Sequence, residues 1–464
     1  MYTYLHCPEH WAQLEFGAAQ LGDLRNNKRV MNIATHLAAR PGGTLPQAFD
    51  GWAELKAAYR FFANPKNSFE LIQAPHCARV LHECHSPGEY LLIEDTTSLS
   101  FNDRACEDLG YIRPGGRGFF LHSTLAVRVE AWDLNQRPEG VVLGLMAQKC
   151  WSRSMLRGKG TESRRALQER QRESQRWAAA LAEAAPGARP TNCRWVLITD
   201  REGDFFEPMH CCLSRGIDFV IRGFHDRCLG GQDEHYLELL AQAPVVGTTA
   251  VELRARPGQS ARTAVLEVRC LRHLSLRGPY RAGRKMADFT VNALEVREAA
   301  PPPGVPPLHW VLLSSLSCER WPEIQQVIGR YCARWWVEEY HKALKTGAGA
   351  QESQLAQQHR LEALVAVLAV VAVRLLNLKF LARTQPDQAV DPAVFGAEAL
   401  RVVEARFGKS SQGAWTHREL LRAVARMGGF IGRRSDGEPG WQTIWRGWQR
   451  LMWMAEGVEL IQRG

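Results

Sequence analysis

Long hydrophobic runs, paired cysteine motifs and internal repeats are missing from this sequence, and each absence excludes a class of protein. The longest uncharged apolar run in the C-terminal third, residues 363–373, is shorter than the roughly 18 to 20 residues of a membrane span, so it predicts a buried helix. The N-terminal segment MYTYLHCPEH has no basic head followed by an apolar core, so we expect no secretory signal and no membrane partner. The twelve cysteines include no CxxC pair, which favours reduced thiols in a cytoplasmic protein.

The composition is that of a globular protein with a basic surface. The chain has 464 residues, of which 45% are hydrophobic and 23% charged, enough for two or three hydrophobic cores. Lysine and arginine total 58 against 49 acidic residues, which gives a formal net charge of +9. This excess favours a polyanionic partner without identifying it.

The N-terminal part of the chain has the pattern of a small basic helical module. Apolar residues recur at spacings of three and four from Val30 to Leu37, beside several lysines and arginines. The residues Pro41-Gly42-Gly43 interrupt this pattern, and a further helix over residues 55–62 is expected to end at Asn64-Pro65.

The middle of the chain has the alternating strand and helix patterns of an α/β core. Three short apolar runs predict strands, and a long polar helix at about residues 162–184 separates them from two more. The five strands are expected at residues 90–93, 119–128, 141–145, 195–198 and 219–221.

The second half begins with alternating stretches and then becomes helical. Residues 223–307 predict a β-rich insertion, and a strand at 309–313 returns to the core. A long helix is expected over 321–345, where Thr346-Gly347-Ala348-Gly349 ends it. Beyond Gln354 the pattern is mostly helical.

Two carboxylates follow predicted buried strands. Asp95 follows the first strand and Asp200 the fourth. Either one alone is ordinarily a solvated strand end. The two strands are expected to be neighbours, however, and two close carboxylates are tolerated mainly around a cation. The pair therefore predicts a site for a hard divalent metal ion.

The helix expected after Trp321 carries a charged stripe. At about 100° per residue, five side chains fall within a stripe roughly 80° wide, and Glu339 lies to its side. The five are Tyr331, Arg334, Glu338, Lys342 and Lys345. One interpretation is a solvated face with i,i+4 ion pairs worth about 0.2–0.5 kcal/mol each. The other is a phosphoryl-transfer site, where the glutamate completes a metal site and the cations hold phosphates.

A cluster of histidines and cysteines offers a different metal site. It comprises His76, Cys77, His82, Cys84 and His85. A zinc finger needs a second ligand pair at a fixed spacing, and none follows, so zinc is the weaker interpretation.

Several ordered motifs carry a resemblance to a known family. The pattern Tyr331-x2-Arg334-x3-Glu338-x6-Lys345 matches the signature of the insertion-sequence-four family of bacterial DDE transposases. The segments IEDTTSLSF, TDREGD and EEYHKALKTGAGA, which contain Asp95, Asp200 and Glu338, also resemble that family and occur in its order. The tail from Gly440 to Leu451, with three tryptophans, resembles the family's dimerisation region.

The resemblance implies an α/β fold with an RNase H-like catalytic core, built on a mixed five-stranded sheet with helices and interrupted by the β-rich insertion. Its domains would be an N-terminal helical DNA-binding domain (1–70), the catalytic domain (71–365) and a C-terminal helical dimerisation region (366–464). Asp95, Asp200 and Glu338 would be the catalytic triad and would bind two Mg²⁺ ions, which Mn²⁺ could replace.

The resemblance also implies DNA contacts. The signature residues Tyr331, Arg334 and Lys345, together with Lys342, would hold the phosphates of a transposon end. Trp310 would pack against a base flipped from the duplex, and Arg222 would help to hold that strand. The competing interpretation of Trp310 is an ordinary core residue. At the N-terminus, Arg60 lies in the recognisable segment Tyr59-Arg60-Phe61.

The function that the resemblance implies is cut-and-paste DNA transposition in the bacterial cytoplasm, at the nucleoid. The expected partners are transposon-end duplex, target DNA and a second copy of the chain in a synaptic dimer, with no small-molecule substrate. Two alternatives stay open from the sequence. One is a metal-dependent, structure-specific DNA nuclease, and the other is a non-catalytic DNA-binding regulator derived from a transposase.

Overall fold

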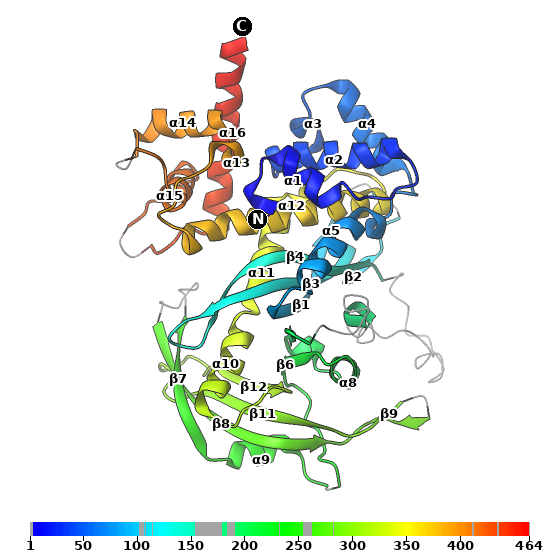
Figure 1. Ribbon diagram of the computed structural model, residues 1–464, viewed down its shortest axis with the longest axis vertical. Helices are drawn as coiled ribbons and strands as arrows, with labels where there is room; N and C mark the ends of the chain where they lie inside the picture. The colour runs from blue at the N-terminus through cyan, green and yellow to red at the C-terminus, as the bar shows by residue number, and fades with distance from the viewer. Residues whose placement is uncertain are drawn as a thin grey trace.

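The computed structural model describes most of the chain (Figure 1). The described residues are 3–101, 106, 108–113, 115–153, 179–182, 191–231, 233–253, 262–281, 283–410, 413–433 and 436–463. Most of the helix expected at 162–184 lies outside these residues, so that prediction is not tested.

The N-terminal part is helical, as the spacing of its apolar residues predicts. After a short turn, Thr3–Leu5, come α1 (Pro8–Phe16), α2 (Leu24–Ala39), α3 (Leu45–Ala48), α4 (Trp52–Ala63) and α5 (Phe69–Glu83). Asp23 starts α2 by accepting a hydrogen bond from the backbone N–H of Arg25. The Pro41-Gly42-Gly43 break and the helix end before Asn64-Pro65 are confirmed.

A mixed sheet forms the centre of the molecule. Its first part runs in the order β4-β3-β1-β5-β6, in which β1 pairs antiparallel with β3 and parallel with β5. The bounds are β1 (Gly88–Ser100), β2 (Tyr111–Arg113), β3 (Gly116–Trp132), β4 (Pro138–Trp151), β5 (Cys193–Thr199) and β6 (Asp218–Arg222). A turn (Arg201–Gly203) and α8 (Phe206–Ser214) connect β5 to β6. All five predicted core strands are present.

The sheet does not end at β6, because the insertion extends it. β12 (His309–Ser314) pairs antiparallel with β6 and joins the core to β11, β8 and β7, so the sheet has ten strands. The five predicted core strands and strands β7, β8 and β11 of the insertion are therefore parts of one continuous sheet. The insertion comprises α9 (Tyr236–Gln242), β7 (Val245–Leu253), β8 (Arg262–Leu276), β9 (Tyr280–Arg281), β10 (Arg284–Lys285) and β11 (Phe289–Glu298).

The helix expected over 321–345 is broken into three pieces. They are α10 (Trp321–Cys332), α11 (Trp335–Lys342) and a π-helical turn (Ala343–Gly347). At the first break the backbone hydrogen bonds change from the α-helical spacing of four residues to a spacing of three. The N–H of Trp336, for example, donates to the carbonyl of Ala333 at 2.9 Å. The stripe predicted for one straight helix therefore spans two helices and a turn.

The C-terminal part is helical and is organised around one long helix. After a turn at Ala350–Glu352, the helices are α12 (Gln358–Thr384), α13 (Pro392–Phe395), α14 (Ala397–Phe407), α15 (His417–Met427) and α16 (Trp441–Arg463). By length and composition α12 could cross a membrane, yet 89% of its most apolar window is buried in the protein. Residues 363–373 are all buried, so the prediction of a buried helix is confirmed.

Helix α12 lies between the N-terminal helices, the sheet and the C-terminal helices (Figure 1). Its buried polar side chains reach each part. Arg374 donates to the carbonyl of Tyr4 at 3.3 Å, and Asn377 donates to the carbonyl of Val142 on β4 at 2.9 Å. The predicted domain boundaries at 70/71 and 365/366 fall inside α5 and α12, so they mark no break in the chain and remain predictions.

Candidate active site

The first two carboxylates are brought together by parallel pairing of β1 with β5. The register pairs Ile93 with Ile198, so Asp95 and Asp200 each stand two residues further along neighbouring strands. Asp200 follows β5 as predicted, and its side chain accepts a hydrogen bond from the backbone N–H of Glu202 at 2.7 Å. Asp95 lies inside β1 instead of at its end, because β3 continues to pair with β1 as far as Ser100.

The environment of Asp95 disfavours its negative charge. Burial and the nearby charge of Asp200 raise its pKa to about 7, and Glu338 acts in the same direction. The Arg334 guanidinium and the backbone N–H of Thr96 oppose the shift. The position thus favours either protonation or a nearby cation.

The third carboxylate comes from α11, which packs on β1. Arg334, at the start of α11, connects it to the first: one guanidinium nitrogen lies 3.5 Å from Asp95 Oδ2, and the other donates to Glu338 Oε1. The side chains of Arg334, Asp95 and Glu338 are all partly buried. The structure therefore brings the three predicted carboxylates into one charged cluster.

The donor chemistry of this cluster fits a divalent cation. Carboxylate oxygens are the ligands that Mg²⁺ prefers, and a cation would relieve the repulsion that raises the pKa of Asp95. As the side chains lie, no three histidine, cysteine, aspartate or glutamate residues among those the structure describes are arranged to hold a metal ion. The Arg334 side chain lies between two of the three carboxylates.

Three other predicted residues form an adjoining group. The rings of Trp310 on β12 and Tyr331 on α10 meet edge to face, with centroids 5.4 Å apart. Arg222, at the end of β6, donates to the carbonyl of His309 at 3.2 Å. Burial raises the pKa of Tyr331, and the nearby Arg222 and Arg334 oppose that shift. Trp310 is half-buried, so it packs on the core and still presents part of its surface.

The two predicted lysines point to different partners. Lys345 lies near Asp95, whose charge opposes the lowering of the lysine pKa by burial. Lys342 turns away from the carboxylate cluster: its Nζ lies 3.1 Å from Glu339 Oε1 and 4.2 Å from the centroid of the Trp335 ring. Arg60 is exposed on α4 in the N-terminal helical part and does not belong to this group.

His341 is a member of the site that the sequence interpretation missed. Its Nδ1 lies 3.9 Å from Asp95 Oδ2. Burial, aided by Lys345, lowers the pKa of this imidazole to about 3, so it is neutral at ordinary pH. Its spacing of three residues from Glu338, one helical turn, was the available signal.

The alternative histidine and cysteine cluster is used for packing instead. His76 is fully buried on α5, where its Nδ1 contacts Glu15 Oε2 at 2.6 Å and its Nε2 accepts from the N–H of Leu145 at 2.9 Å. Both ring nitrogens are therefore engaged by protein groups. His85 Nδ1 contacts the carbonyl of Leu81 at 2.7 Å.

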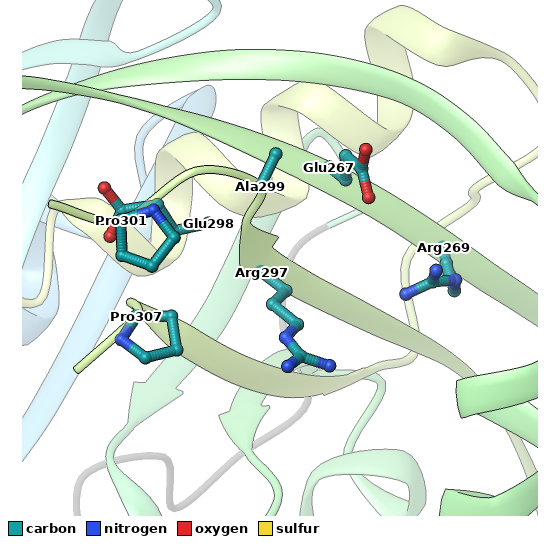
Figure 2. Close-up of a pocket in the computed structure, with 7 residues that line it drawn as sticks. All are labelled: Glu267, Arg269, Arg297, Glu298, Ala299, Pro301 and Pro307. Carbon is teal, nitrogen blue, oxygen red and sulfur yellow. The ribbon is translucent and has the colours of Figure 1, made fainter. Parts of the chain in front are cut away.

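A cavity of about 210 Å³ lies on the insertion and is separate from the carboxylates (Figure 2). It is lined by Glu267, Arg269, Arg297, Glu298, Ala299, Pro301 and Pro307. Arg297 pairs with His309 across the strands, so the cavity opens on the face of the sheet opposite Trp310. In this cavity Arg269 is paired with Glu295 at 2.9 Å.

Comparison with known families identifies the two ends of the chain. A family model described as transposase DNA-binding matches residues 8–67, which contain α1 to α4. A second model, described as the Tn5 transposase dimerisation domain, matches residues 370–463, from within α12 to the end of α16. The carboxylate cluster lies in the part of the chain between these matches.

Proposed function

We propose that the chain is a Tn5-like transposase that cuts and joins DNA strands at the cluster of Asp95, Asp200 and Glu338. Its DNA-binding and dimerisation domains make DNA and a second copy of the chain its partners. Placement in the insertion-sequence-four family is consistent with these matches.

One observation carries the catalytic proposal. Side chains from β1, from the end of β5 and from α11 converge, although more than 100 residues separate each from the next along the chain. A buried group of like charges is costly, and such groups are typical of sites with tuned chemistry. A purely structural role would be served better by apolar residues.

In the proposed reaction, Asp95, Asp200 and Glu338 would hold two divalent cations, Mg²⁺ or Mn²⁺, which supply charge stabilisation for an in-line displacement at phosphorus. Arg334, Lys345 and Tyr331 would bind phosphates of the transposon end. Arg334 would leave the carboxylates for a phosphate oxygen when DNA binds. No covalent protein intermediate is required.

The order of strand events is part of the proposal. Water attacks the phosphodiester at the transposon end and releases a 3′-hydroxyl, which then attacks the opposite strand to form a hairpin. A second water opens the hairpin, and the 3′-end joins target DNA. Trp310 supports this order because its half-buried ring could stack on a flipped base, a contact worth about 1–3 kcal/mol, while Arg222 holds the same strand.

The two alternatives make different predictions. A structure-specific nuclease on the same core would cut DNA without joining ends, and a regulator would bind ends without cutting. The dimerisation domain favours transposition, because paired ends must be cut in one synaptic complex. We place this activity at the nucleoid, in the bacterial cytoplasm.

The test uses the full-length protein and duplexes made from the DNA that flanks its gene. We expect cleavage and strand transfer with Mg²⁺, loss of both in Asp95→Ala and Glu338→Ala, and unchanged gel-shift binding in these variants. Cleavage without joining would establish the nuclease. An Asp95→Ala protein that still cleaved bound ends would refute the assigned site.

A further inference from the structure

A second cluster, centred on a buried glutamate, lies on a different face of α11 from Glu338. Its centre is Glu339, which directly follows Glu338 and is 3% exposed. We call it the Glu339 cluster, and its members are Glu339, Lys342, Lys379 and Trp441. They come from α11, α12 and the first residue of α16, which is the helix that ends the dimerisation domain (Figure 1).

The contacts of Glu339 are short and use both oxygens. Its Oε2 accepts from Lys379 Nζ at 2.6 Å and from the indole N–H of Trp441 at 2.8 Å. Its Oε1 accepts from Lys342 Nζ at 3.1 Å. Lys379 Nζ also lies 4.2 Å from the centroid of the Trp441 ring, so this lysine contacts both Glu339 and Trp441.

The cluster adds fixed hydrogen bonds to a short helix that also packs on β1. α11 has only eight residues, and it lies between the break after α10 and the π-helical turn at Ala343–Gly347. Its rotation about its own axis is therefore not imposed by a continuous helix. Charge-assisted hydrogen bonds to a buried carboxylate demand one geometry, and they add more to specificity than to net stability.

Because consecutive helical residues are about 100° apart, the orientation of Glu339 determines that of Glu338. We propose that Glu339 is a positioning residue, through which the start of α16 sets the place of Glu338 in the active site. The dimerisation domain and the catalytic helix are thereby coupled through Trp441 and Lys379. This inference rests on the proposed catalytic role of Glu338.

The test changes one hydrogen bond and keeps the packing. Trp441→Phe removes the indole donor but retains an aromatic ring. Trp448→Phe on the same helix is the matched control, because its indole nitrogen has no hydrogen-bond partner among the residues that the structure describes. We expect both variants to bind end DNA equally well, although Trp441→Phe should melt at a somewhat lower temperature because it loses a hydrogen bond to a buried carboxylate. Only Trp441→Phe should cleave slower, by about 10-fold, the usual effect of losing a hydrogen bond to a charged group.

A second measurement separates positioning from general damage. We expect Trp441→Phe to need more Mn²⁺ for half-maximal cleavage, and to bind Mn²⁺ more weakly in the protein–DNA complex by electron paramagnetic resonance. In a double-variant cycle, Trp441→Phe should add little to Glu339→Gln, because both break the same link.

Each outcome decides between the two proposals. If Trp441→Phe cleaves and binds Mn²⁺ like Trp448→Phe, the positioning role is wrong. It is also wrong if melting temperature, end binding and cleavage all fall together, because the cluster is then only structural. If the wild-type protein does not cleave, or Glu338→Ala still does, the proposed function fails instead.

Discussion

Among individual residues, Asp95 shows how burial links stability to pH. Its pKa is about 7 in the folded protein against an ordinary 3.8, so between these values the folded chain binds more protons than the unfolded chain. Stability therefore falls as pH rises through this window. We expect Asp95→Asn to abolish cleavage and to raise the melting temperature, more at pH 8 than at pH 5.

The matched control for this prediction is Asp387→Asn, at an exposed position in the C-terminal part. Its melting temperature should change by a similar small amount at both pH values. Calorimetry at the two pH values would make the comparison. An equal gain for Asp95→Asn at pH 5 and pH 8 would contradict the assigned cause.

Glu15 makes stability depend on pH in the opposite direction from Asp95. Despite burial, its contacts with His76 and Arg79 lower its pKa from 4.5 to about 2. Its contribution to stability is present above pH 4.5 and is lost as pH falls towards 2. Breaking a buried pair costs about 3–5 kcal/mol, so we expect Glu15→Gln to be less stable by about that amount at pH 7. Urea unfolding at pH 7 and pH 3 should show the difference shrinking.

Among the helices, α16 contains two glycines with opposite requirements. A Cβ on Gly447 would lie 1.7 Å from the carbonyl oxygen of Val424 on α15, whereas a Cβ on Gly457 would meet nothing within 4 Å. We expect Gly447→Ala to separate α15 from α16 and destabilise the protein by about 1–3 kcal/mol. Gly457→Ala should stabilise it by about 0.5–1 kcal/mol, because alanine favours helix.

Chemical denaturation of both variants makes this comparison within one helix. The two substitutions have the same chemistry, so a difference in sign isolates the effect of close helix packing. If the Gly447→Ala protein were as stable as the Gly457→Ala protein, α15 would be able to move away from α16 without cost, and the predicted clash would be wrong.

The elements also show what local sequence can predict. Strands β1, β5 and β6 were placed because each contains a short apolar run that is buried on both faces. The extension of β1 past Asp95 was missed, since it depends on pairing with a distant part of β3. The break at Ala333 was missed for a similar reason, because the apolar and charged spacing continues across it.

The candidate site also contains some features that the sequence predicts and others that it does not. The neighbourhood of Asp95 and Asp200 follows from strand order and that of Tyr331 with Glu338 from helical spacing, whereas the roles of Trp310 and Arg222 come from family resemblance. Arg334 between two carboxylates could not be predicted, because the direction of a long side chain depends on charges from other elements. Helical spacing places Glu339 outside the stripe, and its partners could not be predicted because they are 40 and 102 residues away.

At the scale of the whole molecule, α16 presents exposed apolar side chains. Trp453 is 63% exposed, Met454 is 42% exposed and Ile461 is 82% exposed. This helix lies in the matched dimerisation domain. We expect Trp453→Ser to weaken dimerisation on DNA by 10-fold or more, since buried aromatic anchors commonly contribute about 2 kcal/mol or more.

Sedimentation of the protein with end DNA would measure this effect. Leu134→Ser is the control, because Leu134 is fully exposed on the turn between β3 and β4, outside the matched dimerisation domain. Both variants should bind a single end equally well. Dimers of undiminished stability in Trp453→Ser would place the interface elsewhere.

The single helix α12 has a consequence for any exchange of the C-terminal part of the chain. The match to the dimerisation domain begins at residue 370, in the middle of a helix whose Arg374 and Asn377 bind the N-terminal part and β4. Recombination at that point would graft a foreign half-helix onto a core shaped for this one. Replacing residues 370–463 by the corresponding segment of another protein should therefore destabilise the chain unless the contacts of Arg374 and Asn377 are kept.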